Sequence, residues 1–569
     1  MRAYFLLHRK FFRISYVIKN LMRSYALIIM TPGSYTRTKI RGSSEGGTMR
    51  NETNLTGKIL LLLIGVIILM LLLLRKGDQE KPVEEDASQE QTELPEESVD
   101  RYEFAIDQTI RVLLKTTDFK SIYHENVILT ADGAVSVTIG ELEKTIPAGS
   151  ELSMSSLFSA YEELTGQEGE GAIVPDKAVF TPDTADGQIK VLTLGRHQGT
   201  PAYRGSLEIR KTDAGYLIIN ELPIEEYLYS VVTSEMPSDY PTQALKAQAV
   251  CARSYAVRQM LDPAYKEYDA DVDDSSGYQV YNNVEESAEA IAAVKETSGK
   301  VVIYQGSIAS TYYFSTSCGQ TTNDEVWRNE EGNLEEQKPY LAAQHIGPKE
   351  DAIAAVKLIE EEGQGASPDL TTEEGFASYI LSVDETDYES AEPWYRWSMS
   401  FYPSQLIHMK ERIAERFAVN KHLILKKDGD HFVSELPKEL SDLSDIKILH
   451  RNEGGLIDEI LLCFGDEEIK ILTEYNIRYI LAAEGAVITK HNQEMADCGL
   501  LLPSAYFTME LKRNESNDIL EEIVLNGGGF GHGVGMSQNG AKNMALSGMD
   551  YQDILSFFYE GTTIGAVYE

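Results

Sequence analysis

A run of sixteen residues without a charge, at 59–74 (ILLLLIGVIILMLLLL), constrains this chain more than any other feature. At ~1.5 Å per helical residue the run is slightly short for a hydrocarbon core of ~30 Å. Lys58 and Arg75 flank it, and their long side chains can reach the interface. Because no small-residue cleavage site follows, an uncleaved anchor is favoured over a signal peptide. We therefore expect one transmembrane helix at 58–75.

The residues around this run predict little ordered structure. Residues 77–99 are acidic, contain proline and lack an apolar period, which predicts a disordered linker. Residues 1–48 are interpreted as a translated leader or a cytoplasmic tail. The letters EGGT before Met49 can be encoded by a ribosome-binding sequence, so the true start is either Met1 or Met49. The net charge of −39 excludes nucleic acid as a natural partner.

The remaining chain is predicted to have an α+β fold in four parts. Short alternating runs separated by Asp-Gly turns predict a β-rich part at 100–220. A helical segment followed by a hairpin is expected at 221–328, and an irregular acidic insertion at 329–393. Mixed elements and a glycine-rich segment occupy 394–569. The four cysteines show no metal-ligand spacing, so two disulfides in three possible connectivities, or isolated thiols, remain open.

Two helices are expected in the second part. The first runs over 225–234, with Pro223 near its start and two glutamates in its first turn. The second lies within 241–261, where a small-residue stripe suits close helix packing. The stripe consists of Leu245, Ala249, Ala252 and Ala256.

Glu235 stands at the end of the first of these helices. The partial negative charge of the helix C-terminus and the apolar neighbours Val231, Val232 and Met236 both disfavour its ionised form. Such a carboxyl group stays protonated near neutral pH and suits general acid catalysis. The alternative is an ordinary helix-terminal glutamate that faces water.

The glycine-rich segment 526–563 fits neither a dinucleotide fingerprint nor a phosphate loop, and no cofactor is expected. His532 lies between glycines, which favours a site role over a core role. Ser537 or Asn539 is expected to cap a helix that stops at Gly548. A second helix is expected from a cap at Asp550 to a stop at Gly561.

Residues 312–327 (YYFSTSCGQTTNDEVW) mix hydroxyls, amides and aromatic rings. Rings can stack on sugars while polar groups bind hydroxyls, so the segment suits glycan recognition. A plain hairpin with a polar turn explains the same residues equally well.

Together these segments resemble the stage II sporulation protein D family, whose domain also occurs in amidase enhancers. The resemblance runs from about residue 108 to 566. It rests on five motifs in order: LPxEEYL at 222–228, SEMP at 234–237, ALKAQAVxAR at 244–253, STS at 315–317 and GFGHGVGMSQxGA at 529–541.

The resemblance implies a lytic transglycosylase that cleaves peptidoglycan glycan strands, preferably those stripped of stem peptides. Glu235 falls at the position of the catalytic acid. The 6-hydroxyl of muramic acid attacks C1 and forms a 1,6-anhydro end, so one glutamate serves first as acid and then as base. A hydrolase would need a second carboxylate, for which Asp239 and Glu221 are the nearest candidates.

Location, partners and supporting residues are likewise implied by the resemblance. The domain is expected outside the cytoplasm on a single-pass membrane anchor, acting in sporulation engulfment. A cell-wall amidase similar to stage II sporulation protein P and a membrane protein similar to stage II sporulation protein M are the implied partners. The implied substrate-binding residues are Lys246, Arg253, Ser317, His532, Ser537 and Gln538.

Lys246 and Arg253 are seven residues apart, so we expect them on one face of the second helix. Some relatives hold zinc near Cys318 and have histidine at the position of Phe314, but no complete ligand set is apparent here, so no metal is expected. The alternative function is a non-catalytic glycan-binding module that stimulates a partner amidase.

Overall fold

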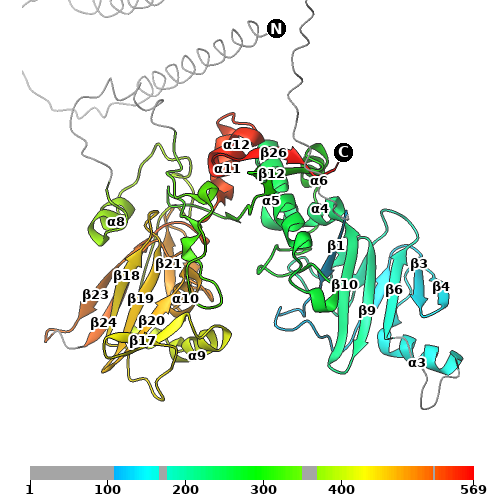
Figure 1. Cartoon of the computed structure of the whole chain (residues 1–569), viewed down its shortest axis with the longest axis horizontal. Helices are drawn as coiled ribbons and strands as arrows, with labels where there is room; N and C mark the ends of the chain where they lie inside the picture. Colours follow the sequence, from blue (N-terminus) through cyan, green and yellow to red (C-terminus); the bar gives the residue numbers. More distant parts are fainter. Residues whose placement is uncertain (1–107, 166–175, 349–367, 517–518, 569) are drawn as a thin grey trace, which may run out of the picture. The chain divides into compact units, whose positions relative to one another are not determined.

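The computed structural model describes residues 108–165, 176–348, 368–516 and 519–568 (Figure 1). The leader, the linker and the expected anchor at 58–75 lie outside these residues. Within the described part of the chain, no helix is long and apolar enough to cross a membrane. The predicted fold class is therefore corrected in this respect: helices and several sheets are mixed, and the single transmembrane helix is not supported.

The alternating runs after residue 108 form two sheets. The larger sheet has the strand order β11-β1-β10-β9-β6-β3-β4, and the smaller one β5-β2-β7-β8. The pairings within both are antiparallel except that of β1 with β11. The strands are β1 (Thr109–Leu113), β2 (Ile128–Ala131), β3 (Val135–Ile139), β4 (Leu142–Ile146), β5 (Leu152–Ser153), β6 (Lys177–Pro182), β7 (Ile189–Val191), β8 (Ala202–Tyr203), β9 (Ser206–Thr212), β10 (Gly215–Pro223) and β11 (Val272–Asp273).

One helix in this region was not expected from the sequence. Helix α3 (Met154–Thr165) follows β5 directly. Met154, Phe158 and Tyr161 are buried and recur with helical spacing, which holds the segment against the core. The turn-rich, alternating sequence on both sides masked this short periodic stretch.

The two helices expected around Glu235 are confirmed. They are α4 (Ile224–Glu235) and α5 (Thr242–Leu261). Helix α5 packs against α4, α6 (Ala288–Glu296), α11 (Gln538–Leu546) and α12 (Tyr551–Phe558) (Figure 1). All four residues of the predicted small-residue stripe are at most 1 % exposed, which lets these neighbours approach closely. Helix α5 thus forms the centre on which the candidate site is built.

Short strands connect this helical centre to distant parts of the chain. The expected hairpin forms from β12 (Lys300–Tyr304) and β13 (Ser307–Ile308), and β26 (Thr563–Ala566) joins it along the other edge of β12. Strands β14 (Tyr313–Phe314) and β25 (Met536–Ser537) pair in parallel, with Phe314 opposite Ser537. This pair brings the segment after the hairpin beside the glycine-rich segment.

The C-terminal part contains two further antiparallel sheets of five strands each, with the orders β22-β21-β15-β24-β23 and β17-β16-β20-β19-β18. Helices α8 (Glu373–Ile380), α9 (Met409–Val419) and α10 (Glu474–Ile480) belong to the same part. The strands are β15 (Trp397–Phe401), β16 (Ile424–Asp428), β17 (His431–Val433), β18 (Asp445–Arg451), β19 (Ile457–Phe464), β20 (Glu467–Leu472), β21 (Val487–Lys490), β22 (Met495–Asp497), β23 (Phe507–Arg513) and β24 (Leu520–Gly527).

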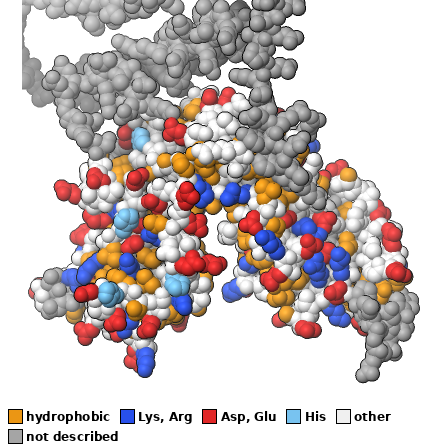
Figure 2. All heavy atoms as spheres, viewed as in Figure 1, with side chains coloured by type: hydrophobic (Ala, Val, Ile, Leu, Met, Phe, Trp, Pro, Cys, Tyr) orange, Lys and Arg blue, Asp and Glu red, His pale blue; other side chains and the backbone are white. Residues whose placement is uncertain are grey.

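Surface charge and cysteines add little to the chemistry. On the face shown in Figure 2, acidic and basic side chains of the described residues are interspersed, so the acidic excess is not gathered into one patch there. Cys251, Cys318, Cys463 and Cys498 all carry free thiols, so none of the three possible disulfide connectivities is present.

Candidate functional site

Glu235 is the last residue of α4 and is half-buried. The backbone N–H of Val280 donates a hydrogen bond of 2.7 Å to its Oε1, and the hydroxyl of Tyr313 interacts with the same carboxyl group. Burial among apolar neighbours raises the pKa of Glu235 to about 7, and the two hydrogen bonds only partly oppose this effect. A carboxyl group with this pKa holds a proton near neutral pH and can also release it.

The raised pKa of Glu235 has a consequence for stability. A buried acid with a raised pKa destabilises the fold as the pH rises from the unfolded pKa toward the folded one. Glu235→Gln keeps an acceptor for Val280 and removes the charge, so we expect it to increase the free energy of unfolding by about 1–3 kcal/mol at about pH 8 and by less at about pH 4. Urea unfolding at both pH values measures this gain. An equal gain at both values would contradict the raised pKa, and Asp239→Asn, at an exposed neighbour, is the control.

Tyr313 belongs to a buried polar network beneath Glu235. Its hydroxyl accepts a hydrogen bond of 3.2 Å from Nε2 of Gln279, whose Oε1 accepts one of 3.3 Å from Tyr227. Gln279 and Tyr227 are at most 1 % exposed. Because each of these polar groups has a partner, the network holds the Tyr313 hydroxyl beside the acid.

Gln538 brings the glycine-rich segment to Glu235, across 303 residues of sequence. Its Nε2 donates a hydrogen bond of 3.0 Å to the backbone carbonyl of Glu235 and one of 3.4 Å to Oε1 of Gln248. Helix α11 begins at Gln538, with Ser537 as its N-cap and Gly548 beyond its end in a left-handed conformation. The predicted helix boundaries are confirmed here, and likewise the cap of α12 by Asp550.

The alternating glycines let this segment pass close to its neighbours. Gly533 and Gly535 have φ values of +80° and +77°, a region that other residues rarely adopt. A Cβ atom at Gly535 would collide with the backbone carbonyl of Tyr312, and one at Gly533 would lie 2.6 Å from the Tyr506 hydroxyl. Glycine is therefore required at both positions by conformation and by space.

His532 lies between the rings of Phe314 and Trp327, with centroid distances of 5.7 and 5.4 Å. Its Nδ1 accepts a hydrogen bond of 3.1 Å from the backbone N–H of Val534. Burial lowers the pKa of His532 to about 4, so the ring is neutral at neutral pH. Among the described residues, its hydrogen bonds and ring contacts do not include Glu235.

Lys246 and Arg253 lie on one face of α5, as their spacing predicts, but both are paired within the protein. Lys246 forms an ion pair with Glu296 at the end of α6. Arg253 is fully buried and binds both carboxylate oxygens of Glu225 at 2.7 Å, and it also donates to the backbone carbonyls of Val294 and Lys300. In this structure Arg253 joins α4, α6 and β12.

Ser317 and Ser537 are also buried, and both contact a residue that the sequence did not single out. The hydroxyl of Ser537 donates a hydrogen bond of 2.7 Å to Oε1 of Glu389, and the backbone N–H of Ser317 donates one of 2.9 Å to the same atom. The hydroxyl of Ser317 donates a hydrogen bond to Oε2 of Glu389. Glu389 lies in the acidic segment for which the sequence suggested no function. Aromatic residues such as the neighbouring Tyr388 were a signal there, because aromatic residues are uncommon in a solvated acidic stretch.

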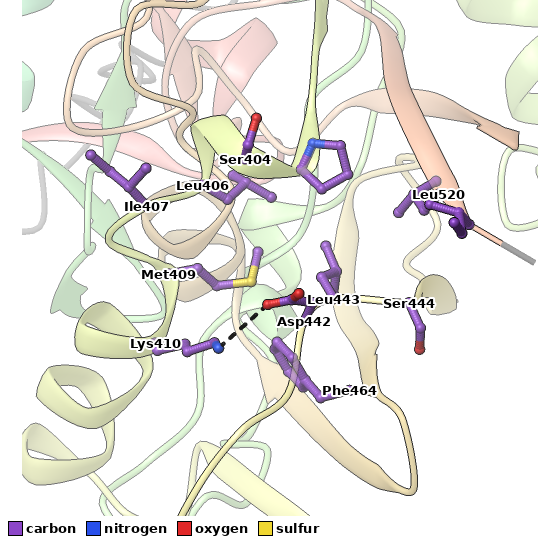
Figure 3. A pocket seen from close by; sticks show the side chains of 12 residues that line it. Ser404, Leu406, Ile407, Met409, Lys410, Asp442, Leu443, Ser444, Phe464 and Leu520 are labelled. Atoms are coloured by element: carbon purple, nitrogen blue, oxygen red, sulfur yellow. Dashed lines mark ion pairs between the residues drawn. The ribbon is translucent and has the colours of Figure 1, made fainter. Parts of the chain in front are cut away.

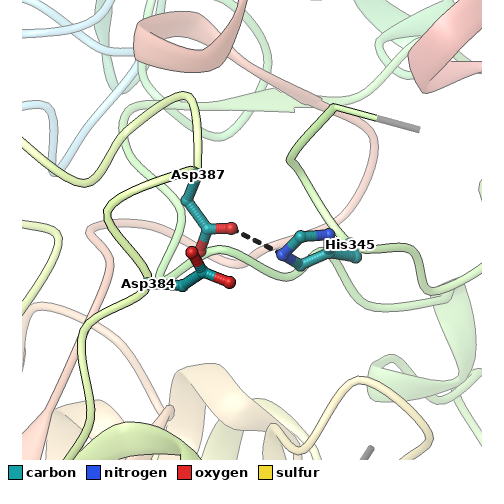
Figure 4. Close-up of side chains that lie close together, drawn as sticks. All are labelled: His345, Asp384 and Asp387. Atoms are coloured by element: carbon teal, nitrogen blue, oxygen red, sulfur yellow. Dashed lines mark hydrogen bonds and ion pairs between the residues drawn. The ribbon is translucent and has the colours of Figure 1, made fainter. Parts of the chain in front are cut away.

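One group of side chains in the described residues resembles a metal-ligand set. Potential ligand atoms of His345, Asp384 and Asp387 lie within 4.8 Å of one another (Figure 4). His345 Nε2 and Asp387 Oδ1 are 2.5 Å apart, and the other Asp387 oxygen accepts a hydrogen bond from Tyr395. Cys318 is not part of this group, and burial raises the pKa of its thiol to about 12, which disfavours the thiolate that zinc requires.

A pocket of about 670 Å³ opens in another part of the described chain (Figure 3). Met409, Phe464 and Leu520 are among the side chains that line it, and Lys410 and Asp442 face each other there at 4.0 Å. None of the predicted site residues lines this pocket. Its apolar walls and single ion pair provide no acid comparable to Glu235.

Comparisons with known proteins relate this part of the chain to one protein family. Residues 212–304, which include Glu235 and Arg253, match a family described as Stage II sporulation protein. The chain is 26 % identical over 360 residues to the stage II sporulation protein D of Bacillus subtilis, covering 61 % of this chain and 75 % of that protein.

Two further relatives extend the comparison. An amidase enhancer of Bacillus subtilis is 26 % identical over 338 residues, which cover 59 % of this chain and only 40 % of the enhancer. An uncharacterized protein of Brachyspira hyodysenteriae is 27 % identical over 464 residues, covering 81 % of this chain and 94 % of that protein. The similarity therefore extends well beyond the matched family domain.

Proposed function

The chain belongs to the stage II sporulation protein D family, and from this premise we propose that it cleaves the glycan strands of peptidoglycan as a lytic transglycosylase outside the cytoplasm. A cell-wall role in sporulation follows from the family and from the amidase enhancer among its relatives. The observation that carries the catalytic proposal is Glu235, a half-buried acid at the end of α4 whose pKa is raised by burial to about 7.

The surroundings of Glu235 favour transglycosylation over hydrolysis. A hydrolase needs a second carboxylate near the first. Among the described residues, no other carboxylate contributes to the pKa shift of Glu235. Glu221 is paired with Arg111, and Asp239 is exposed. With one acid, the nucleophile must come from the substrate, and the 6-hydroxyl of muramic acid is such a nucleophile.

The proton has a defined path in this mechanism. Protonated Glu235 donates its proton to the glycosidic oxygen while the C1–O bond breaks. The resulting carboxylate accepts the proton of the 6-hydroxyl as that oxygen bonds to C1 and closes the anhydro ring. The N–H of Val280 and the hydroxyl of Tyr313 stabilise the carboxylate between the two steps, because both donate to it.

We expect the purified protein to convert glycan strands stripped of stem peptides into products that end in 1,6-anhydro-muramic acid. Mass spectrometry distinguishes these products from reducing ends, which are heavier by one water. Strands that keep their stem peptides are the matched control and are expected to react more slowly. Reducing ends as the main product would contradict the mechanism and would require a second carboxylate.

The second candidate function is a non-catalytic module that binds glycan and stimulates a partner amidase. The amidase enhancer among the relatives supports it. An amidase similar to stage II sporulation protein P and a membrane protein similar to stage II sporulation protein M are the partners that we propose in either case. Stimulation of an amidase that survives Glu235→Gln, with no anhydro product from either protein, would favour this second function.

A further inference from the structure

Glu389 is a fully buried carboxylate that lies between α8 and β15. It accepts three hydrogen bonds, from the backbone N–H of Ser317, the hydroxyl of Ser317 and the hydroxyl of Ser537. In the part of the chain that the structure describes, no lysine or arginine forms an ion pair with it. A buried charge without a cation is costly unless donors satisfy it, so the three donors explain why it is tolerated.

Both serines adjoin groups that contact Glu235. Ser537 caps α11, and the next residue, Gln538, donates to the backbone carbonyl of Glu235. Ser317 follows β14, which carries Tyr313, the hydroxyl partner of the Glu235 carboxyl group. Strands β14 and β25 pair in parallel, so Glu389 binds β25 at its last residue, Ser537, and the other chain at Ser317, three residues after β14 ends.

The same acidic segment holds α11 at a second point. Glu392 accepts hydrogen bonds from Lys542 at 2.6 Å and from Asn543 at 2.8 Å, and both donors lie in α11. The start of the helix and its second turn are therefore fixed by two carboxylates three residues apart. A segment added only for solubility would not place two of its acids in this way.

We propose that Glu389 is a positioning residue for Glu235, which it serves by holding Ser317 and Ser537 and, through them, Tyr313 and Gln538. This inference rests on the proposed function and adds the acidic segment to the catalytic apparatus. Glu389 does not touch the substrate in this role. It keeps the donor groups around Glu235 in their places.

The three hydrogen bonds from Ser317 and Ser537 require the ionised form of Glu389, because three donors need a group that only accepts. Burial raises the pKa of Glu389 to about 7, and the hydrogen bonds from the two serines oppose that rise. The ionisable groups that face it are Glu392 on its own segment, the Cys318 thiol beyond Ser317, and Tyr240.

Glu235 must be protonated to act as an acid while Glu389 must be ionised to hold the site. Activity is therefore expected to fall on both sides of neutral pH. In a plot of kcat against pH, protonation of Glu389 is expected to cause the fall on the acidic side, called the acidic limb. Deprotonation of Glu235 is expected to cause the fall on the alkaline side, called the alkaline limb. In Glu389→Gln the amide presents a donor to the serines, so this variant resembles the protonated state at every pH.

Tryptophan fluorescence can report on the hydrogen bonds between Glu389 and the two serines without a measurement of enzymatic activity. The chain has three tryptophans, and all lie against the glycine-rich segment. The ring centroids of Trp327 and His532 are 5.4 Å apart, and those of Trp394 and Phe530 are 4.9 Å apart. Nε1 of Trp397 donates a hydrogen bond of 3.2 Å to the backbone carbonyl of Gly529.

The experiment compares the purified wild-type chain with Glu389→Gln, Ser317→Ala and Glu385→Gln. Glu385 is an exposed acid of the same segment and serves as the control. In the wild type and the control, we expect a fluorescence change with a midpoint near pH 7 and a kcat with an acidic limb near the same pH. Glu389→Gln is expected to lose both and to lower kcat about 10- to 100-fold with little change in KM.

Ser317→Ala covers the case in which Glu389→Gln does not fold. It removes one donor from the carboxylate, so the fluorescence midpoint and the acidic limb should move to higher pH. An unchanged midpoint in this variant, or a wild-type fluorescence titration in Glu389→Gln, would overturn the role of Glu389. Failure of the proposed function would show differently, as the absence of anhydro products from the wild-type protein.

Discussion

Replacing Glu235 by glutamine is expected to reduce the formation of anhydro-muramic ends by at least about 100-fold, the usual range for the loss of a general acid. Glutamine keeps the length of the side chain and an oxygen that accepts the N–H of Val280. It cannot give a proton to the glycosidic oxygen or take one from the 6-hydroxyl. The loss should therefore appear in kcat, with KM for the glycan little changed.

The pH dependence of the wild type provides a second check on Glu235. Because burial raises its pKa to about 7, the protonated fraction falls as the pH rises through 7, and kcat should fall with it. Asp239→Asn is the matched control and should leave both the rate and the alkaline limb unchanged, since Asp239 is exposed. Full cleavage by Glu235→Gln would require another acid and would contradict the mechanism.

Replacing Arg253 by methionine is expected to reduce the free energy of unfolding by about 3–5 kcal/mol, the range for breaking a buried ion pair from one side. Arg253 has no exposed side chain, and its partner Glu225 is only 19 % exposed. Burial alone would raise the pKa of Glu225, but the hydrogen bond and charge of Arg253 outweigh it and lower that pKa. Without Arg253, the carboxylate keeps the Gly299 N–H and the Tyr568 hydroxyl as partners, but no cation.

The sign of the pH effect distinguishes this role from substrate binding. A lowered carboxyl pKa stabilises the fold above the unfolded pKa, and that contribution disappears as the pH falls through the folded pKa. The wild type and Arg253→Met should therefore differ most at neutral pH and converge in acid, as measured by urea unfolding. Lys246→Met is the control on the same helix face, with an expected loss of about 0–1 kcal/mol because Glu296 is 56 % exposed. A stable Arg253→Met protein that binds glycan weakly would contradict the structural role.

Local signals in the sequence predicted the helices around the site well. The start of α4 near Pro223, the cap of α11 at Ser537 and the cap of α12 at Asp550 all depend on residues within one turn of the helix end. The raised pKa of Glu235 was also foreseen, because its apolar neighbours Val231, Val232 and Met236 are adjacent in sequence. Helix α3 was missed because its buried positions are few and lie between strongly alternating strands.

Contacts over long sequence separations gave results that no local pattern contained. Arg253 looks like a basic group on a helix face, yet 28 residues separate it from the glutamate that it binds. Glu389 looks like one acid among many in a solvated stretch, yet it joins serines 72 and 148 residues away. The metal-like group at His345 likewise joins residues that no spacing rule connects.

The raised pKa of Glu235 could thus be inferred from the residues adjacent to it, because desolvation and helix termination act over a few residues. The partners of Glu235 could not be inferred in this way. Val280, Tyr313, Gln538 and, behind them, Glu389 are brought together by the packing of α4, α5, α11 and the β14–β25 pair. Such packing depends on the burial of many side chains at once, and this cooperative term is not encoded in any short stretch of sequence.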